Sequence, residues 1–568
     1  MVAGRDLAVQ AATDLDILGG ALIAQNSLIA TAGRDLTVAS STAERSYAPT
    51  QEAGIQASVA RQVIDRVAGL YVTGENGVLV AAAGRDLAVL AAEIASAGDA
   101  ALAAQRDLTL GTVTETSNAA TSSKGNRWRE NIAAEAGSRL AVAGNLALSA
   151  GNDLTARAAT AEAGGVLSAL AGNDLTLEAG ESTRSTERWH KSSKGSGLAK
   201  RSSKSRDTLD ETVTTGSTFV GGTVLLQAGN DLALTGSNAF ADQDIALIAG
   251  RDLTLEAAYD THAETHFRKE KKSGFSASFA TGVSYGTSSL KENGESTTAT
   301  AVGSQIGGND VLLSAGRDVT VAGSAVLADR DLDVIAGRDV NLRAAENRFT
   351  EDYRVKSSGS SLAIIPGPAP RQTLYGKTDM SQDSTASGNQ ATASLLSANG
   401  GDLTIIAGAD ASHAGTGRGN VTSEGVDLLA RQTVRIEGNA VSLLASDSRS
   451  QFDSVTKSKS VTVGAALAGT VGSLITRAYD MAEASRQGTG NRRLDNALAL
   501  KAGYDGWKAY DSLGKALAVE ADGAAAADGD STPNASDHPT PCPATAPAVR
   551  RTSRCVRCGG RRMPARRV

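Results

Sequence analysis

The sequence is poor in aromatic residues, cysteine and proline, and each scarcity narrows the fold. Aromatic side chains make up 3% of the 568 residues, so Ala, Val and Leu must supply the core. The three cysteines, Cys542, Cys555 and Cys558, lie in the last 27 residues, and a cysteine-free body is compatible with secretion. No proline occurs between Pro49 and Pro366, which suits long β-ladders because proline cannot donate a ladder hydrogen bond.

Other absences bear on partners, location and chemistry. A net charge of −6 argues against a nucleic-acid partner for the whole chain. No run of 18 apolar residues predicts a membrane span, and no G-x-S-x-G or glycine-rich phosphate loop predicts an enzyme or a cofactor. Met1 leads directly into a repeat with no signal peptide before it. We therefore expect an internal piece of a longer protein, or a reading frame assigned from an internal start.

The chain is dominated by a repeated phrase, Ala-Gly-Arg/Asn-Asp-Leu/Val-x-Leu/Val. Copies begin at Ala3, Ala32, Ala83, Ala150, Ala171, Ala228, Ala249, Ala315 and Ala336. The aspartates of neighbouring copies are 21 residues apart in four pairs: Asp86 and Asp107, Asp153 and Asp174, Asp231 and Asp252, Asp318 and Asp339. Internal repetition at a fixed period is typical of a solenoid.

Each phrase is typical of a turn followed by a strand. Glycine supplies a tight corner, and Asn or Asp can bond the turn backbone. Leu-x-Leu has a period of two, so both leucines point to one face. A parallel β-helix of about 21 residues per coil explains this, with Leu154 and Leu175 stacked in the interior. A leucine-rich-repeat solenoid is the weaker alternative, because the L-x-x-L-x-L-x-x-N pattern is absent.

Stretches rich in Ser, Thr, Lys and Arg separate the repeat pairs. Glu181–His190 and Tyr259–Phe267 each lead to a Lys/Ser/Gly turn and a returning Ser/Thr-rich segment. This pattern predicts β-hairpin arms projecting from the solenoid wall. We expect a β-helix over residues 1–460, with arms at about 111–140, 181–220, 257–305 and 345–395.

The coils and arms together resemble the haemagglutinin repeats of filamentous haemagglutinins. Over roughly residues 1–520 they are most similar to the second repeat region of contact-dependent growth inhibition exoproteins, and Asn496–Asp505 resembles that family's passage toward its pre-toxin region. The resemblance implies a right-handed, all-β solenoid on the bacterial cell surface or secreted. It also implies an outer-membrane two-partner secretion transporter, a target-cell receptor or glycan, and, in the inhibition branch, a C-terminal toxin. This chain lacks the family's N-terminal signal and secretion domain and a recognisable toxin.

One predicted arm is strongly basic. The segment from Arg184 to Arg206 contains one acid, Glu187, and eight cations: Arg184, Arg188, Lys191, Lys194, Lys200, Arg201, Lys204 and Arg206. They predict a site for anionic surface polymers such as lipopolysaccharide or sulfated glycans. The alternative is a solvated hairpin whose lysines block edge pairing. The basic run Arg268–Lys272 allows the same two interpretations.

Metal and enzyme motifs are weak. His262 and His266 fall on one strand face, but the zincin pattern needs Glu directly after the first His, on a helix. Gly307–Asp310 is similar to a calcium-binding nonapeptide but occurs once. No metal or cofactor is therefore expected. The enzyme alternative is a β-helix polysaccharide-degrading enzyme, although three tryptophans are few for a sugar cleft.

The pattern changes after residue 460. Leu467, Val471 and Leu474 recur at helical spacing, so residues 461–520 are predicted to be a helical, pre-toxin-like spacer. A membrane-active entry segment is the alternative for that region. Residues 521–568 are predicted to be a disordered Pro/Arg-rich tail, in which Cys555 and Cys558 form half a zinc site at best and which we interpret as out-of-frame sequence. Overall, the sequence predicts a structural and adhesive passenger fragment, with no enzymatic activity.

Overall fold

The computed structural model describes residues 1–47, 54–196, 199–278, 282–365, 372–409, 415 and 418–463. The chain divides into two units, Met1–Ala524 and Ala525–Val568, and every described residue lies in the first. In this described part all regular elements are β-strands, and no helix has the length and apolar character of a membrane span. The predicted helical spacer and tail lie outside the described residues, apart from residues 461–463.

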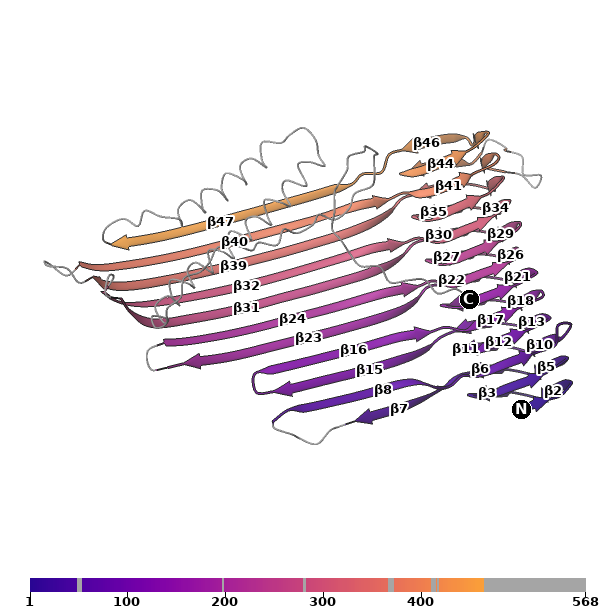
Figure 1. The fold of residues 1–568 in the computed structure, drawn as a ribbon. Helices are drawn as coiled ribbons and strands as arrows, with labels where there is room; N and C mark the ends of the chain where they lie inside the picture. The colour runs from indigo at the N-terminus through magenta and orange to yellow at the C-terminus, as the bar shows by residue number, and fades with distance from the viewer. Residues whose placement is uncertain are drawn as a thin grey trace, which may run out of the picture. The chain divides into compact units, whose positions relative to one another are not determined.

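The strands form three parallel sheets of 12 strands, named A, B and C, and one antiparallel sheet of 11 strands, the arm sheet (Figure 1). Sheet A contains β1 (Val2–Ala3), β4 (Ala21–Ala24), β9 (Gly69–Val72), β12 (Glu93–Ser96), β17 (Arg139–Val142), β20 (Thr160–Ala163), β25 (Thr218–Gly221), β28 (Asn238–Ala241), β33 (Gln305–Gly308), β36 (Ala325–Ala328), β41 (Ser394–Ala398) and β44 (Val426–Ala430). Sheet B contains β2 (Asp6–Ala11), β5 (Ser27–Ala32), β10 (Val78–Ala83), β13 (Asp99–Ala104), β18 (Leu146–Ala150), β21 (Val166–Ala171), β26 (Thr223–Ala228), β29 (Ile245–Ala249), β34 (Val311–Ala315), β37 (Leu332–Ala336), β42 (Leu403–Ala407) and β45 (Val434–Glu437). Sheet C contains β3 (Leu15–Leu18), β6 (Leu36–Ala39), β11 (Leu87–Leu90), β14 (Leu108–Gly111), β19 (Leu154–Arg157), β22 (Leu175–Glu178), β27 (Leu232–Thr235), β30 (Leu253–Glu256), β35 (Val319–Ala322), β38 (Val340–Arg343), β43 (Asn420–Glu424) and β46 (Ala440–Leu444).

One strand from each parallel sheet makes a coil, and the chain visits sheets A, B and C in that order. Each coil pairs in parallel with the next, and the register confirms the predicted period, because Leu154 pairs with Leu175 and Val319 with Val340. Where an arm intervenes, the ladder resumes in the same register, as Leu175 pairs with Leu232. The predicted β-helix is therefore confirmed.

The core is a column of aliphatic side chains inside the coils. Strand alternation sends Leu36 and Val38 inward, where both are fully buried, while Thr37 between them is partly exposed. Phe219 is the largest fully buried side chain. Because every interior position abuts the same position one coil away, stacked Leu, Val and Ala fill the narrow interior, which accounts for the scarcity of aromatic residues.

The arm sheet is built from hairpins that all leave the solenoid at the corner between sheets C and A. Its strands are β7 (Ser41–Tyr47), β8 (Gln56–Arg66), β15 (Val113–Ser123), β16 (Asn126–Ala136), β23 (Gly180–Gly195), β24 (Ala199–Thr215), β31 (Ala258–Ser278), β32 (Gly282–Val302), β39 (Ala345–Ile365), β40 (Gln372–Thr392) and β47 (Arg449–Val463). Hairpins alternate strictly with direct turns, so every second coil carries an arm strand pair. A coil without an arm closes this corner through a residue of positive φ, such as Ala158 (47°) or Gly236 (55°).

The alternation has a geometric cause. Neighbouring strands in a sheet lie about 4.8 Å apart, so a hairpin of two strands occupies about 9.6 Å, the rise of two coils. Consecutive hairpins therefore meet at normal pairing distance. Pairs such as Thr208 with Thr265, between β24 and β31, join one hairpin to the next in an unbroken antiparallel ladder. The arms are thus one continuous sheet (Figure 1).

Three details of the arms differ from the predictions. The hairpin of β7 and β8 was not predicted. Lysines do not block edge pairing in β23 and β24, since both strands pair on both sides. Finally, β47 extends to Val463, past the predicted boundary at residue 460, because Val461 and Val463 continue the ladder with β40.

Buried serines stabilise the roots of the arms. Ser217 follows β24, where the chain re-enters the solenoid, and its side chain is fully buried. Its Oγ lies 2.8 Å from the Glu178 carbonyl oxygen and accepts a hydrogen bond from the Ala159 backbone N–H at 3.1 Å. The hydroxyl thereby accepts from the Ala159 N–H and gives the Glu178 carbonyl a second donor beside the Ala158 N–H.

The spacing rule predicts that a small deletion should be more harmful than a large one. Deleting residues 304–323 removes one coil without an arm and brings two hairpins onto adjacent coils, about 4.8 Å apart, where they cannot both pair. Deleting residues 304–393 removes that coil together with the next coil and its hairpin, and preserves the alternation. Hydrogen exchange should show lost amide protection in β32 and β39 for the smaller deletion and retained protection of β32 for the larger. Equal protection of the remaining arms in both variants would contradict the rule.

Candidate functional site

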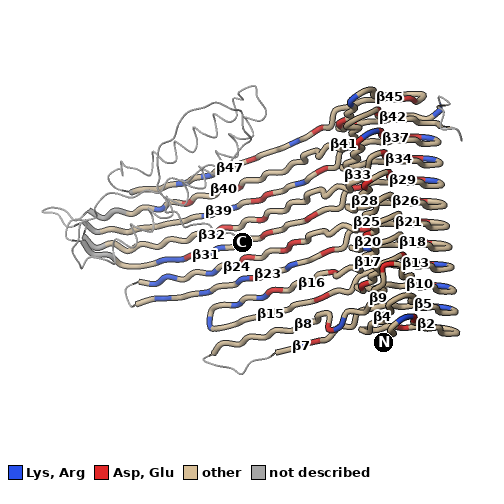
Figure 2. Tube along the Cα trace, turned by 45° about the vertical axis from the view of Figure 1, so that its right-hand side comes forward, with Lys and Arg blue, Asp and Glu red and all other residues tan. Residues whose placement is uncertain are grey.

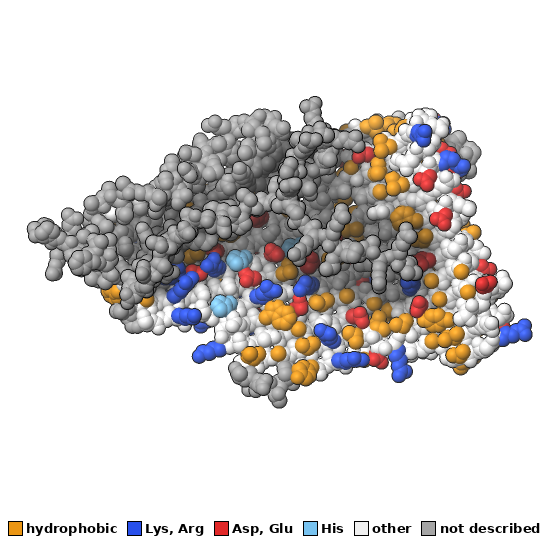
Figure 3. Space-filling model, viewed as in Figure 1, with side chains coloured by type: hydrophobic (Ala, Val, Ile, Leu, Met, Phe, Trp, Pro, Cys, Tyr) orange, Lys and Arg blue, Asp and Glu red, His pale blue; other side chains and the backbone are white. Residues whose placement is uncertain are grey.

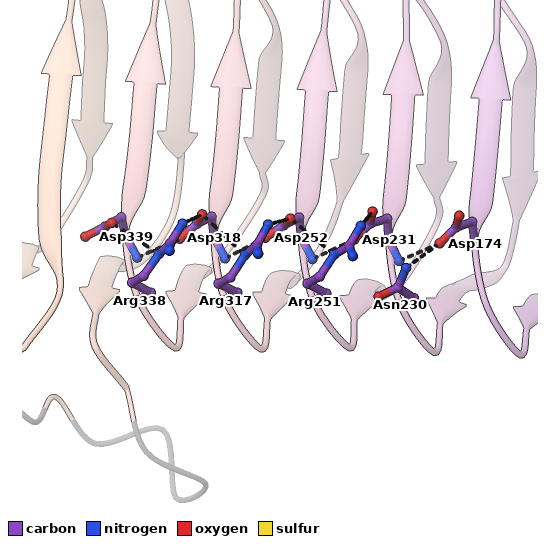
Figure 4. Close-up of polar contacts among 9 residues, drawn as sticks. All are labelled: Asp174, Asn230, Asp231, Arg251, Asp252, Arg317, Asp318, Arg338 and Asp339. Carbon is purple, nitrogen blue, oxygen red and sulfur yellow. Dashed lines mark hydrogen bonds and ion pairs between the residues drawn. The ribbon is translucent and has the colours of Figure 1, made fainter.

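The first of two charged arrays is a ladder of aspartates along the corner between sheets B and C. The Asp318 carboxylate accepts hydrogen bonds from Arg338 Nε at 2.7 Å and from the Asp339 backbone N–H at 3.2 Å. Asp252 makes the same contacts with Arg317 and Asp318 one coil earlier. The aspartates from Asp174 to Asp318 thus bind the phrase of the next coil (Figure 4), whereas Asp6 of the first copy lies at the corner between sheets A and B and accepts a hydrogen bond from Asn26 Nδ2 at 2.9 Å.

Arginine and asparagine alternate in the repeated phrase because both can donate to this carboxylate. Asp174 accepts hydrogen bonds from Asn230 Nδ2 at 2.9 Å and from the Asp231 backbone N–H at 3.1 Å. An amide donor therefore takes the place of the guanidinium donor in this contact (Figure 4). Asp310 lies in the Gly307–Asp310 segment that is similar to a calcium site. It belongs to a second row of such contacts, and its carboxylate accepts a hydrogen bond from Arg330 Nε at 2.7 Å.

These contacts lower the pKa of two carboxyl groups of the repeated phrase. The hydrogen bond from Arg85 lowers the pKa of Asp35 below its ordinary value. At Asp318 burial raises the pKa, but the hydrogen bonds from Arg338 and the Asp339 amide outweigh it and the net shift is downward. A general acid at neutral pH needs the opposite shift. The repeated aspartates are therefore corner residues with a structural role.

The second array is the basic part of the arm sheet, in which cations lie on several neighbouring strands (Figure 2). The eight predicted binding residues lie on β23 and β24, but strand alternation divides them between two faces. Lys191, Lys200, Lys204 and Arg206 share one face, named the lysine face. Arg184, Arg188, Lys194 and Arg201 share the other, named the histidine face because it carries His190, His262 and His266. The eight residues do not form one patch.

On the histidine face several cations are paired with acids. Arg184 lies 2.6 Å from Glu130, and Arg268 lies 2.6 Å from Glu270. Burial raises the pKa of Glu270, but the hydrogen bond from Arg268 and the charges of nearby cations lower it by more. The net shift is downward, so the carboxylate stays ionised. Figure 3 shows this face as a mixture of cationic, acidic and histidine side chains.

The two histidines considered as zinc ligands have acidic neighbours. His266 Nδ1 lies 2.5 Å from Asp207 and His262 Nε2 lies 3.2 Å from Glu264. Both histidines are on the histidine face, but the described part of the chain contains no group of three or more metal-ligating side chains.

A cavity of about 430 Å³ lies beside the short hairpin of β15 and β16, where the longer β23 continues past it. Its lining includes Trp128, Trp189, Arg188 and His190. Sequence reasoning treated the three tryptophans as too few for a sugar cleft. The register between β16 and β23 places the two tryptophans on neighbouring strands but on opposite faces of the sheet, since Trp128 pairs with Arg188 and Arg127 pairs with Trp189.

The sequence of this chain is similar to those of known proteins. The model of the hemagglutinin repeat family matches residues 119–266, 197–326, 283–367 and 375–504. The chain is 29% identical over 441 residues to the tRNA nuclease CdiA of Escherichia coli (strain STEC_O31), covering 77% of this chain and 12% of that protein. It is 28% identical over 327 residues to the deoxyribonuclease CdiA of Yersinia pseudotuberculosis, covering 48% of this chain and 30% of that protein. It is 34% identical over 161 residues to the toxin CdiA of Yersinia pestis, covering 28% of this chain and 5% of that protein. No solved structure matches.

The corner ladder predicts a pH-dependent contribution to stability. Asp318→Asn should lower the free energy of unfolding by about 1 kcal/mol at neutral pH, because the Arg338 contact loses its charge. The folded pKa of Asp318 is depressed below 3.8, so the stabilisation is present above that pH and is lost as pH falls through the folded pKa. Denaturant unfolding measured from neutral pH to below pH 3.8 should show the free energies of unfolding of the unchanged protein and of Asp318→Asn converging in acid. Asp16→Asn, at an exposed aspartate with no side-chain partner in the described residues, is the control. A difference that persists after protonation would contradict the charge-based account.

Proposed function

We propose a function from the premise that this chain belongs to the hemagglutinin-repeat family: it is a structural and adhesive passenger segment of a secreted cell-surface exoprotein. The relatives it matches are named as CdiA toxins and nucleases, and the chain spans 12% of the length of the Escherichia coli protein. We assign the nuclease activities in those names to parts of the relatives that this chain does not match. The passenger would mediate adhesion or present a C-terminal toxin in contact-dependent growth inhibition.

The observation that carries this proposal is the arm sheet. Coils alone would suffice to build a solenoid, yet half of them extend arms whose strands reach 21 residues, roughly 70 Å when extended. Continuous pairing between hairpins makes these arms a broad sheet with two solvent-facing sides. Such a surface is suited to contact with another large object, such as a cell surface.

The charge pattern favours binding over catalysis. The repeated carboxylates are engaged by Arg, Asn and backbone N–H groups and have lowered pKa values at Asp14, Asp35 and Asp318. Those properties hold coils together and do not suit proton transfer. We therefore propose a non-enzymatic passenger in preference to a polysaccharide-degrading enzyme.

The partners follow from the same proposal. An outer-membrane two-partner secretion transporter would export the protein to the cell surface, and a receptor or glycan on a target cell would bind the arms. The predicted anionic-polymer site remains part of this proposal, now with Lys191, Lys200, Lys204 and Arg206 on one face of the arm sheet and Arg184, Arg188, Lys194 and Arg201 on the other.

Removal of the arms tests this function. In the variant, all five hairpins are replaced by the short Gly236–Ser237 type of corner, which already closes coils without arms. Beads coated with the intact chain should bind bacterial or host cells, and beads coated with the armless solenoid should bind at least about tenfold less. Circular dichroism of the variant verifies that the solenoid still folds. Undiminished binding by the armless variant, or release of oligosaccharides from acidic polysaccharides by the intact chain, would refute the proposal.

A further inference from the structure

The lysine face carries a row of lysines that crosses the arm sheet. Lys191 on β23 lies directly opposite Lys204 on β24, which lies opposite Lys269 on β31. The row continues through Lys291 on β32 and Lys356 on β39. Ser381 on β40 interrupts it, and it ends at Lys457 on β47. Five consecutive strands thus present one lysine each at the same level.

This arrangement is unfavourable for the isolated sheet. Directly opposite residues on neighbouring strands are about 4.8 Å apart, and like charges in such pairs are destabilising. Lys269 is partly exposed and the other five are exposed. Among the residues that the structure describes, none of the six ammonium groups forms an ion pair. The arms also contain acidic residues, but these lie at other positions and do not neutralise the row.

The neighbouring rows on the same face extend the positive surface and add hydroxyl groups. On the distal side lie Ser202, Lys271 and Ser289, which are paired in that order across β24, β31 and β32. On the proximal side Arg206 is paired with Glu187 at 2.9 Å. Acids enter these rows only on β40, as Asp379 and Asp383, the strand that also breaks the lysine row.

We propose that the lysine row binds a linear anionic polysaccharide that lies across the arm strands, parallel to the solenoid axis. The row supplies one compact positive charge about every 4.8 Å, which suits a polymer with carboxylate or sulfate groups at regular intervals. The adjacent serine hydroxyls can donate to and accept from sugar hydroxyls. This inference rests on the proposed function, since it specifies which face binds and the chemical class of the ligand.

An apolar row near the distal end of the same face supports a sugar ligand. Phe275, Tyr285, Leu362 and Tyr375 lie opposite one another on β31, β32, β39 and β40. Their exposed fractions are 53%, 39%, 44% and 42%, and the rings of Phe275 and Tyr285 are 4.6 Å apart between centroids. Lys269 and Phe275 are six residues apart on β31, about 20 Å along the strand, so the aromatic rings of this row would contact the apolar faces of sugar rings in a second stretch of polymer, beside the one that the lysines bind.

Two triple variants of the full chain test the proposal, because each removes three positive charges from the same arms. K204Q/K269Q/K291Q acts on the lysine row, and R188Q/K194Q/K272Q acts on the histidine face. The probes are heparin and polygalacturonate, with neutral dextran as the control, in titrations at low and physiological ionic strength. The first triple should weaken binding to both anionic polymers roughly tenfold or more and reduce its salt dependence, and the second, which removes cations of the other face, should weaken it by no more than about threefold.

Several outcomes would overturn the inference. Equal losses in the two triples would mean that net charge alone attracts the polymer. Lysine-dependent binding to anionic phospholipid vesicles without binding to either polysaccharide would assign the row to a membrane surface. The first triple relieves repulsion, so its thermal midpoint should not fall, and a fall would mean that lost binding reflects lost structure. Cell binding that requires the arms but is unaffected by the first triple would reject this inference and leave the proposed function standing.

Discussion

The structure depends on one match of dimensions: two strands of a hairpin occupy the same height as two coils of the solenoid. Both spacings come from the backbone hydrogen bond, which sets neighbouring strands about 4.8 Å apart in any sheet. A hairpin on every second coil therefore allows arms that are far apart in the sequence to pair as neighbours. The solenoid holds the roots of the arms at the correct spacing. The arm sheet in turn adds hydrogen bonds between successive hairpins.

The corner chemistry maintains this pitch. Aspartates of the repeated phrase such as Asp174 bind an Arg or Asn side chain and a backbone N–H of the next coil, and buried serines such as Ser217 occupy the positions where arms rejoin the coil. These contacts fix the register of successive coils, which in turn fixes which arm residues lie opposite one another. The lysine row is a consequence of that register, since residues as distant in sequence as Lys191 and Lys356 reach one level only because every coil is in place.

Much of the solenoid could be predicted from the sequence, because period and alternation are local signals. The 21-residue separation of Asp153 and Asp174 is the separation of directly stacked residues such as Leu154 and Leu175. The first hairpin also had a signal that was overlooked, since 51 residues, far more than one coil, separate Asp35 from Asp86, whose backbone N–H donates to the Asp35 carboxylate. The pairing of hairpins with one another could not be predicted, because the Lys/Ser/Gly turn pattern marks single hairpins and does not say which arms lie side by side. The basic arm was interpreted as one site because alternation was not applied to it, although alternation divides its eight cations between two faces.

The most direct test of the account is whether residues on different hairpins lie opposite each other as the coil pitch requires. Thr208 on β24 and Thr265 on β31 form such a pair, with their hydroxyl oxygens 2.5 Å apart. The solenoid and arms contain no cysteine, so after Cys542, Cys555 and Cys558 are replaced by serine, a Thr208→Cys/Thr265→Cys variant has a single possible disulfide. Opposed residues in an antiparallel pair are within disulfide reach, whereas the shifted pair Thr208→Cys/Glu264→Cys places its thiols on opposite faces. Mild oxidation followed by quantification of free thiols should show an intramolecular bond in the first variant and none in the second. Equal reactivity of the two variants, or cross-linking of the shifted pair alone, would contradict the common pitch of coils and arms.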